Sequence, residues 1–217
     1  MIIKNKNEPF FHIIVDEIFS HSVLPMVYEE INSLKNEFKS EDMTKPAIDN
    51  FGNSLKKNKG VFLLESKNYK NSKIISSINA SIKKISEYKN WQNKTFCRMY
   101  NSAVWGGELL NCYSSGDYYM PHTDSGLFTM ITFLYENYTN GGSRGGDLYF
   151  PEYDYLHKCN NNQAIIFFSK ELHGATTFTC NKNCKRYSIV TFSQLDNFSD
   201  KNHEVRKIKS KNKIDYQ

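Results

Sequence analysis

The segment YMPHTDSG, residues 119–126, places a histidine and an aspartate two residues apart, between a proline and a glycine. Side chains of an extended strand alternate between its two faces, so His122 and Asp124 are expected on the same side. An imidazole nitrogen and a carboxylate oxygen on one side can bind one metal ion, but two donors hold it poorly. A polar turn before the apolar run LFTMITFLY is the simpler interpretation. The metal hypothesis therefore needs a third donor from elsewhere in the chain.

His173 is the best candidate for that donor. It lies between the apolar segments AIIFF and ATTF, so it is expected at a strand end, as His122 is. Two histidines and one carboxylate on one side of a metal leave the other side open, which is the facial triad of non-heme Fe(II) oxygenases. His157 lies in the turn-like segment PEYDYLHK and is expected at the surface. The remaining histidines lie in the N-terminal region and the C-terminal tail: His12, His21 and His203.

A second motif follows this histidine. Arg186 begins the apolar segment RYSIVTFS, and Ser188 lies two residues later, on the same face of the expected strand. A buried arginine needs a partner, because an unpaired charge in the interior is costly. A bound carboxylate would supply it through a bidentate contact, with the serine hydroxyl adding one hydrogen bond.

The secondary-structure elements that must position these residues are expected to be helices early in the chain and short strands later. Two early segments carry apolar residues at steps of three and four, which predicts helices lying against a sheet: Leu24, Val27, Ile31, Leu34 and Phe38 in the first, and Ile74, Ile78, Ile82 and Ile85 in the second. After about Thr95, short β-type segments alternate with turn residues: 96–104, GELLNCY, FTMITFLY, DLYF, AIIFF, ATTF and RYSIVTFS.

Seven or so short strands at close spacing predict a β-sandwich or a small barrel. The expected fold is therefore α+β, with no repeat or linker that divides the chain. We expect a single domain over residues 1–217: mainly helical support over 1–95, a β-sandwich catalytic core over 96–195, and a basic tail over 196–217.

The order His122-x-Asp124, His173 and Arg186-x-Ser188 resembles that of the Fe(II)- and 2-oxoglutarate-dependent dioxygenases, in particular the prolyl 4-hydroxylase-like group. The segments around these residues are similar as well: NCYSSGDYYMPHTD, FTMITFLYEN, NGGSRGGDLYFP and NNQAIIFFSKELHGATTF. The resemblance covers residues 108–194. It implies a double-stranded β-helix, the jelly-roll or cupin-like core, with the N-terminal helices packed on its major sheet.

Carried over residue by residue, the resemblance implies His122, Asp124 and His173 as catalytic iron ligands. It implies Arg186 as the anchor for the distal carboxylate of 2-oxoglutarate, with Ser188 beside it. Fe(II) would be the metal, with 2-oxoglutarate and O₂ as co-substrates. The need for ascorbate stays open.

Three tyrosines also match positions that the group uses. Tyr113 and Tyr135 stand where its members have tyrosines that hydrogen-bond the co-substrate. Tyr119 is a candidate for the wall of the active site.

The sequence departs from some branches of the family. Collagen-type prolyl 4-hydroxylases carry a lysine where this chain has Arg186, so the resemblance favours the arginine-bearing branches. Enzymes that repair alkylated bases carry a second arginine where Phe192 stands, and halogenating relatives carry a small residue where Asp124 stands. Both of these activities are therefore disfavoured.

The resemblance implies hydroxylation of a substrate C–H bond with release of succinate and CO₂. A prolyl residue in a protein or peptide is the leading substrate, and a free amino acid, another small metabolite or a nucleobase is the alternative. A hypothesis of another class is a non-catalytic, metal-bound β-sandwich. The Arg186-x-Ser188 motif argues against it, because a structural metal needs no carboxylate anchor.

The composition of the chain does little to distinguish between these possible substrates and functions. The formal net charge of the 217 residues is +5, too small to indicate nucleic acid by itself, and no stacking motif supports such a partner. NGGSRGG lacks the Lys-Ser/Thr pair of a phosphate loop and is expected to be a flexible hairpin near the site. No secretory signal or membrane-spanning run is present, which favours a cytoplasmic protein without a membrane partner. The odd number of cysteines, five, favours reduced structural thiols.

Overall fold

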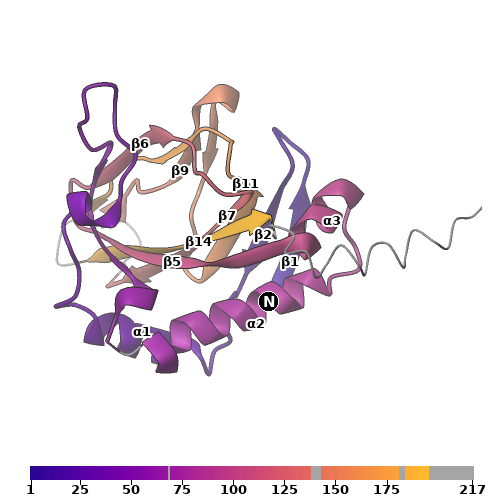
Figure 1. The fold of residues 1–217 in the computed structure, drawn as a ribbon, viewed down its shortest axis with the longest axis horizontal. Coiled ribbons are helices and arrows are strands. Elements are labelled where there is room, and N and C mark those ends of the chain that lie inside the picture. Colours follow the sequence, from indigo (N-terminus) through magenta and orange to yellow (C-terminus); the bar gives the residue numbers. More distant parts are fainter. Residues whose placement is uncertain (68, 138–142, 181–183, 196–217) are drawn as a thin grey trace, which may run out of the picture.

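A seven-stranded antiparallel sheet forms the centre of the computed structural model, which describes residues 1–67, 69–137, 143–180 and 184–195 (Figure 1). The strand order is β1-β2-β11-β7-β14-β5-β4. The strands span Ile2–Lys6 (β1), His12–Asp16 (β2), Lys59–Phe62 (β4), Ala103–Tyr113 (β5), Phe128–Glu136 (β7), Gln163–Phe168 (β11) and Lys185–Leu195 (β14).

A second, five-stranded sheet faces the first and has the order β10-β9-β12-β6-β3. Its strands span Lys56–Lys57 (β3), Tyr118–His122 (β6), Leu148–Phe150 (β9), Tyr155–His157 (β10) and His173–Ala175 (β12). A short ribbon pairs β8, Ser143–Arg144, with β13, Thr179–Cys180. The two facing sheets confirm the predicted β-sandwich of an α+β fold.

Strand β7 shows how the alternation of side chains builds both sides of the large sheet. Ile131 and Phe133 belong to the apolar cluster between the two sheets, whereas Met130 and Leu134 belong to the cluster under the helices. All four are buried, so the strand is apolar on both faces and its sequence is a near-continuous run of apolar residues.

Three α-helices lie against the outer face of the large sheet (Figure 1). They span Leu24–Ser33 (α1), Lys73–Ser86 (α2) and Lys94–Ser102 (α3), and short 3-10 helices span Glu41–Thr44, Leu63–Glu65, Tyr69–Asn71 and Pro151–Tyr153. Ile74, Ile78 and Ile85 of α2 are fully buried, as their spacing predicts, whereas Ile82 of the same predicted stripe is only partly buried. None of the helices in the described ranges is both long enough and apolar enough to cross a lipid bilayer.

Three features differ from the sequence analysis. Residues 96–104 were expected as a strand but lie mostly in α3, because Asn93 accepts a hydrogen bond from the Phe96 amide at the helix N-terminus and Phe96 and Tyr100 share its buried face. The first 95 residues also supply four strands, β1 to β4. Cys180 and Cys184, expected as reduced thiols, are joined in a disulfide. The basic tail 196–217 lies outside the described residues.

Candidate active site

His122, Asp124 and His173 converge at one end of the small sheet. One candidate donor atom of each lies within 4.8 Å of those of the other two. The Nε2 atom of His122 is 3.6 Å from Oδ1 of Asp124, and that of His173 is 3.5 Å from Oδ2. The two histidines are direct partners across the antiparallel pair β6 and β12. The strand ends therefore bring together residues that lie about fifty positions apart.

Each imidazole is oriented by a backbone carbonyl two residues earlier. Nδ1 of His122 lies 2.9 Å from the carbonyl oxygen of Met120, and Nδ1 of His173 lies 2.9 Å from that of Glu171. A carbonyl can only accept, so Nδ1 carries the proton in the neutral ring and Nε2 keeps its lone pair. Both lone pairs then point toward Asp124, the orientation that metal-binding histidines need.

Asp124 is fixed from the side of the large sheet. The Thr129 hydroxyl donates to its Oδ2 at 2.6 Å and lies 2.9 Å from the Ser169 hydroxyl. The Asp124 amide donates to the Ser169 carbonyl at 2.8 Å. Thr129 was not singled out in the sequence, although the alternation along β7 puts it on the same face as Ile131, toward the cavity. The carboxylate therefore has one orientation before any ligand binds.

Burial keeps both imidazoles in the neutral form. Burial and the neighbouring His173 ring lower the pKa of His122 to about 4. Burial also lowers the pKa of His173. Neutral imidazoles are required for metal binding, so both rings are ready to coordinate at neutral pH.

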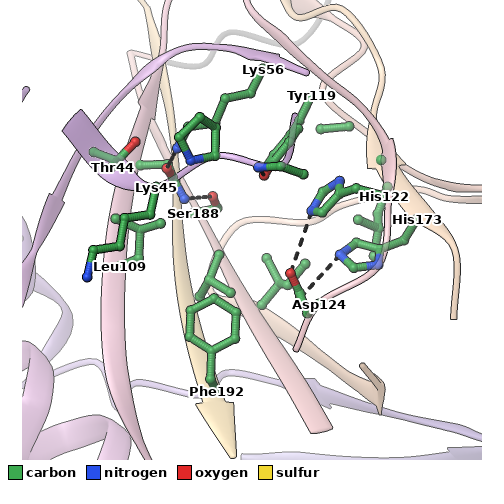
Figure 2. Close-up of a pocket in the computed structure, with 18 of the residues that line it drawn as sticks. Thr44, Lys45, Lys56, Leu109, Tyr119, His122, Asp124, His173, Ser188 and Phe192 are labelled. Atoms are coloured by element: carbon green, nitrogen blue, oxygen red, sulfur yellow. Dashed lines mark hydrogen bonds and ion pairs between the residues drawn. The ribbon is translucent and has the colours of Figure 1, made fainter. Parts of the chain in front are cut away.

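A cavity of about 350 Å³ extends from the triad into the space between the two sheets. Figure 2 shows His122, Asp124 and His173 on one side of it, with Lys56 and Ser188 on the other. Tyr119 also lines the cavity and stacks on His122 with ring centroids 3.7 Å apart. Its hydroxyl accepts a hydrogen bond from the Ala47 amide at 2.9 Å. Tyr119 therefore forms part of the wall of this cavity.

Arg186 lines the same cavity and is 1% exposed. Its guanidinium carbon lies 4.5 Å from the centroid of the Tyr113 ring and 5.3 Å from that of Phe133. Its Nε and Nη1 atoms are buried and make no hydrogen bond with any residue in the described part of the chain. Two buried donors without a partner in a cavity fit a ligand that brings a carboxylate.

Tyr113 and Tyr135 flank Arg186 on the neighbouring strands β5 and β7. Tyr113 lines the cavity, whereas Tyr135 is not among the residues described as lining it. The Tyr135 hydroxyl donates to the Cys159 carbonyl at 3.2 Å. Burial raises the pKa of both phenols, so both keep their protons as hydrogen-bond donors.

Two further cavity residues carry polar groups that the sequence analysis missed. Lys56 and Asn111 are both buried, and the ammonium group of Lys56 donates to Oδ1 of Asn111 at 3.2 Å. They are 55 positions apart in the sequence. No local pattern distinguishes Lys56 from its neighbours in KKNK, so the sequence held no signal for it.

His157 was expected at the surface, but it is buried at the end of β10. Its Nε2 lies 2.9 Å from Oε1 of Gln163, which gives the buried ring a polar partner. Within the described residues, the group of side chains that could hold a metal contains only His122, Asp124 and His173. His157 therefore belongs to the polar interior beside β11 and not to this site.

The model of the 2OG-Fe(II) oxygenase superfamily matches residues 108–194. No curated protein sequence matches the chain. Similar solved structures include a prolyl hydroxylase from Trichoplax adhaerens in complex with a hypoxia inducible factor peptide fragment, with 15% identity, a TM-score of 0.58, and coverage of 85% of this chain and 84% of that one.

Two further solved structures have the same fold. The viral collagen prolyl hydroxylase of Paramecium Bursaria Chlorella virus-1, in its 2OG complex, is 13% identical, with a TM-score of 0.53 and coverage of 83% of this chain and 96% of that one. A Pseudomonas putida prolyl-4-hydroxylase is 11% identical, with a TM-score of 0.54 and coverage of 84% and 91%.

These likenesses confirm the predicted double-stranded β-helix core. The matched segment contains the whole His122–Arg186 constellation, from the first strand of the motif to the last. Residues 108–194 thus match the 2OG-Fe(II) oxygenase superfamily, and the chain has the fold of the prolyl hydroxylases.

Proposed function

We propose that the protein is a hydroxylase that uses Fe(II), 2-oxoglutarate and O₂ to hydroxylate a prolyl residue of a peptide or protein. His122, Asp124 and His173 hold the metal in this proposal. Arg186 and Ser188 bind the distal carboxylate of 2-oxoglutarate, and Tyr113 lies beside them. The products are succinate, CO₂ and the hydroxylated substrate.

The observation that carries the proposal is the state of Arg186. A guanidinium that is 1% exposed, with two nitrogen atoms that have no partner among the described residues, would be costly in a protein that binds no anion. It opens into the cavity that the three metal-binding candidates also line. A ligand with a carboxylate at one end and a metal-chelating group at the other satisfies both ends of this cavity.

Each residue has a physical task in the reaction. Fe(II) with bound 2-oxoglutarate supplies the oxidative chemistry that activates O₂ and attacks the C–H bond. The three ligands leave one side of the metal site open for the reactants. The Thr129 hydroxyl and the two backbone carbonyls hold the ligands in place. Tyr119 covers one imidazole and restricts access of water from that side.

A peptidyl proline is favoured because the similar solved structures are prolyl hydroxylases, one of them in complex with a peptide. The alternatives from the sequence use the same chemistry on a free amino acid, another small metabolite or a nucleobase. The non-catalytic metal clasp is disfavoured because it gives the buried Arg186 no partner.

The test is succinate production from 2-oxoglutarate with Fe(II) and O₂, scored with proline-containing peptides, free amino acids and oligonucleotides for a 16-dalton gain. We expect a peptide to gain this mass, and Arg186→Met to abolish the gain while the protein still binds metal. A gain only on amino acids or oligonucleotides would replace the proposed substrate. Protein that holds zinc and makes no succinate with any of them would support the clasp.

A further inference from the structure

Lys56 is a buried lysine in the wall of the candidate active site. It lies on β3 opposite Tyr119 of β6 and is 3% exposed. Its ammonium nitrogen is 5.6 Å from the centroid of the Tyr119 ring. Burying an ammonium group is costly, so its position calls for a reason beyond packing.

A chain of two hydrogen bonds leads from Lys56 to Ser188. The ammonium group donates to Oδ1 of Asn111 at 3.2 Å, and Nδ2 of Asn111 donates to the Ser188 hydroxyl oxygen at 3.4 Å. Asn111 and Ser188 are register partners on β5 and β14, and both are buried. Gly60 of β4 leaves room for the amide, since a Cβ there would lie 3.1 Å from its Oδ1.

The direction of this chain is set by Lys56. An ammonium group can only donate, so the oxygen of the Asn111 amide must face it and the NH₂ group must face Ser188. The serine oxygen then accepts from Asn111, so its own proton goes to a different acceptor, for which the Tyr113 oxygen and a bound carboxylate compete. Ser188 lies two residues after Arg186 on β14, so both side chains are on the same face and both line the cavity.

We propose that Lys56 is a positioning residue for 2-oxoglutarate, which holds Asn111 so that Ser188 donates to the distal carboxylate beside Arg186. This inference rests on the proposed function. Without Lys56 the amide can turn, and the Ser188 proton then goes to Oδ1 of Asn111 and is lost to the ligand.

The test measures the dissociation constants of two 2-oxo acids for the Fe(II)-loaded full-length protein by anaerobic calorimetry. 2-Oxopentanoate has the same chelating end as 2-oxoglutarate but no distal carboxylate. We expect Lys56→Met to weaken the binding of 2-oxoglutarate by about tenfold, which corresponds to the loss of one hydrogen bond to a charged group. The affinity for 2-oxopentanoate should not change. Lys57→Met, at the exposed neighbouring position on β3, is the matched control and should bind both as the wild type does.

A double substitution separates the hydrogen-bond chain from a through-space charge effect. Ser188→Ala removes the final donor, so Lys56→Met added to it should cause no further loss. If the lysine charge acted through space, the affinity lost on Lys56→Met would instead add to the affinity lost on Ser188→Ala. Asn111→Asp gives a second route if Lys56→Met does not fold, because a carboxylate accepts from both Lys56 and Ser188 and should also weaken 2-oxoglutarate.

The inference is overturned if Lys56→Met, or Asn111→Asp in its place, binds 2-oxoglutarate as tightly as the wild type. It is also overturned if the lysine substitution weakens both acids equally or if its loss adds to that of Ser188→Ala. Wild-type protein that binds 2-oxopentanoate as tightly as 2-oxoglutarate would overturn the carboxylate-binding role of Arg186 as well. These outcomes separate a failure of the Lys56 role from a failure of the proposed function.

Discussion

His173 lies directly opposite His122 across the β6–β12 pair, and the centroids of the two imidazoles are 4.6 Å apart. A single cross-strand position thus fixes two of the three candidate metal ligands. A Cβ at Gly174, the next residue, would lie 2.7 Å from the Tyr119 carbonyl oxygen, so the close approach of the two strands requires glycine there.

The first prediction concerns the charge of the metal site. Asp124→Asn keeps the shape of the side chain but removes its negative charge, and we expect Fe(II) affinity to fall by more than about 100-fold, since even outer partners of metal ligands contribute 10- to 100-fold. Anaerobic calorimetry measures this. The exposed His21→Ala serves as the control, and equal affinities for the two variants would contradict the assignment of Asp124 as a ligand.

The second prediction concerns the hydroxyl that orients Asp124. Thr129→Val removes a 2.6 Å hydrogen bond to Oδ2 without changing the side-chain shape, and we expect about a 10- to 100-fold loss of metal affinity. Thr129→Ser keeps the hydroxyl and should restore most of that affinity. If the valine variant binds metal as tightly as the wild type, the Thr129 hydroxyl does not position Asp124 and the prediction is wrong.

The third prediction concerns the backbone next to Arg186. Gly146 has φ of +70°, and a Cβ there would lie 2.6 Å from Cδ of Arg186. Gly146→Ala should therefore displace the guanidinium, raise the KM for 2-oxoglutarate and lower the free energy of unfolding by about 1–3 kcal/mol. Gly106→Ala, with no atom within 4 Å of the added Cβ, is the matched control for urea unfolding and kinetics. Similar effects of both substitutions would contradict the steric argument.

The fourth prediction concerns stability in acid. Burial lowers the pKa of His12 from 6.5 to about 4, and its Nδ1 lies 3.0 Å from the Phe10 carbonyl. The unfolded chain therefore binds more protons at this residue between those two pH values. The contribution of His12 is complete above pH 6.5 and is lost, by about 3 kcal/mol, as the pH falls to 4.

Urea unfolding at a series of pH values measures this contribution. His12→Leu cannot bind the proton, so its free energy of unfolding should fall less steeply over the same range. His21→Leu, at an exposed position, should keep the wild-type slope. A wild-type slope in His12→Leu would show that other groups cause the acid sensitivity.

Much of this site could be predicted from the sequence, because the alternation of side chains within a strand is a local property. The pair His122 and Asp124 needs only a period of two, and so does the pair Arg186 and Ser188. His173 was found through the apolar segments around it. The family model matches the segment that contains these motifs.

The parts that the sequence missed depend on pairing between distant strands. Lys56 reaches Asn111 only because β3 pairs with β6 and β4 pairs with β5. The charged, turn-like surroundings of His157 gave no indication that Gln163 would satisfy its ring in the interior. At residues 96–104 the aromatic and β-branched side chains favoured a strand, but the Asn93 cap and the buried face of α3 decided the structure.

Arg186 lies between two cross-strand tyrosine neighbours, Tyr113 on β5 and Tyr135 on β7. A one-residue slip of β14 would turn the guanidinium to the opposite face of the sheet. Under the proposed function, affinity for a diacid therefore requires the native strand register. A diacid that binds there stabilises the folded chain in that register. The concentration of the co-substrate would therefore also affect the fraction of the protein that stays folded.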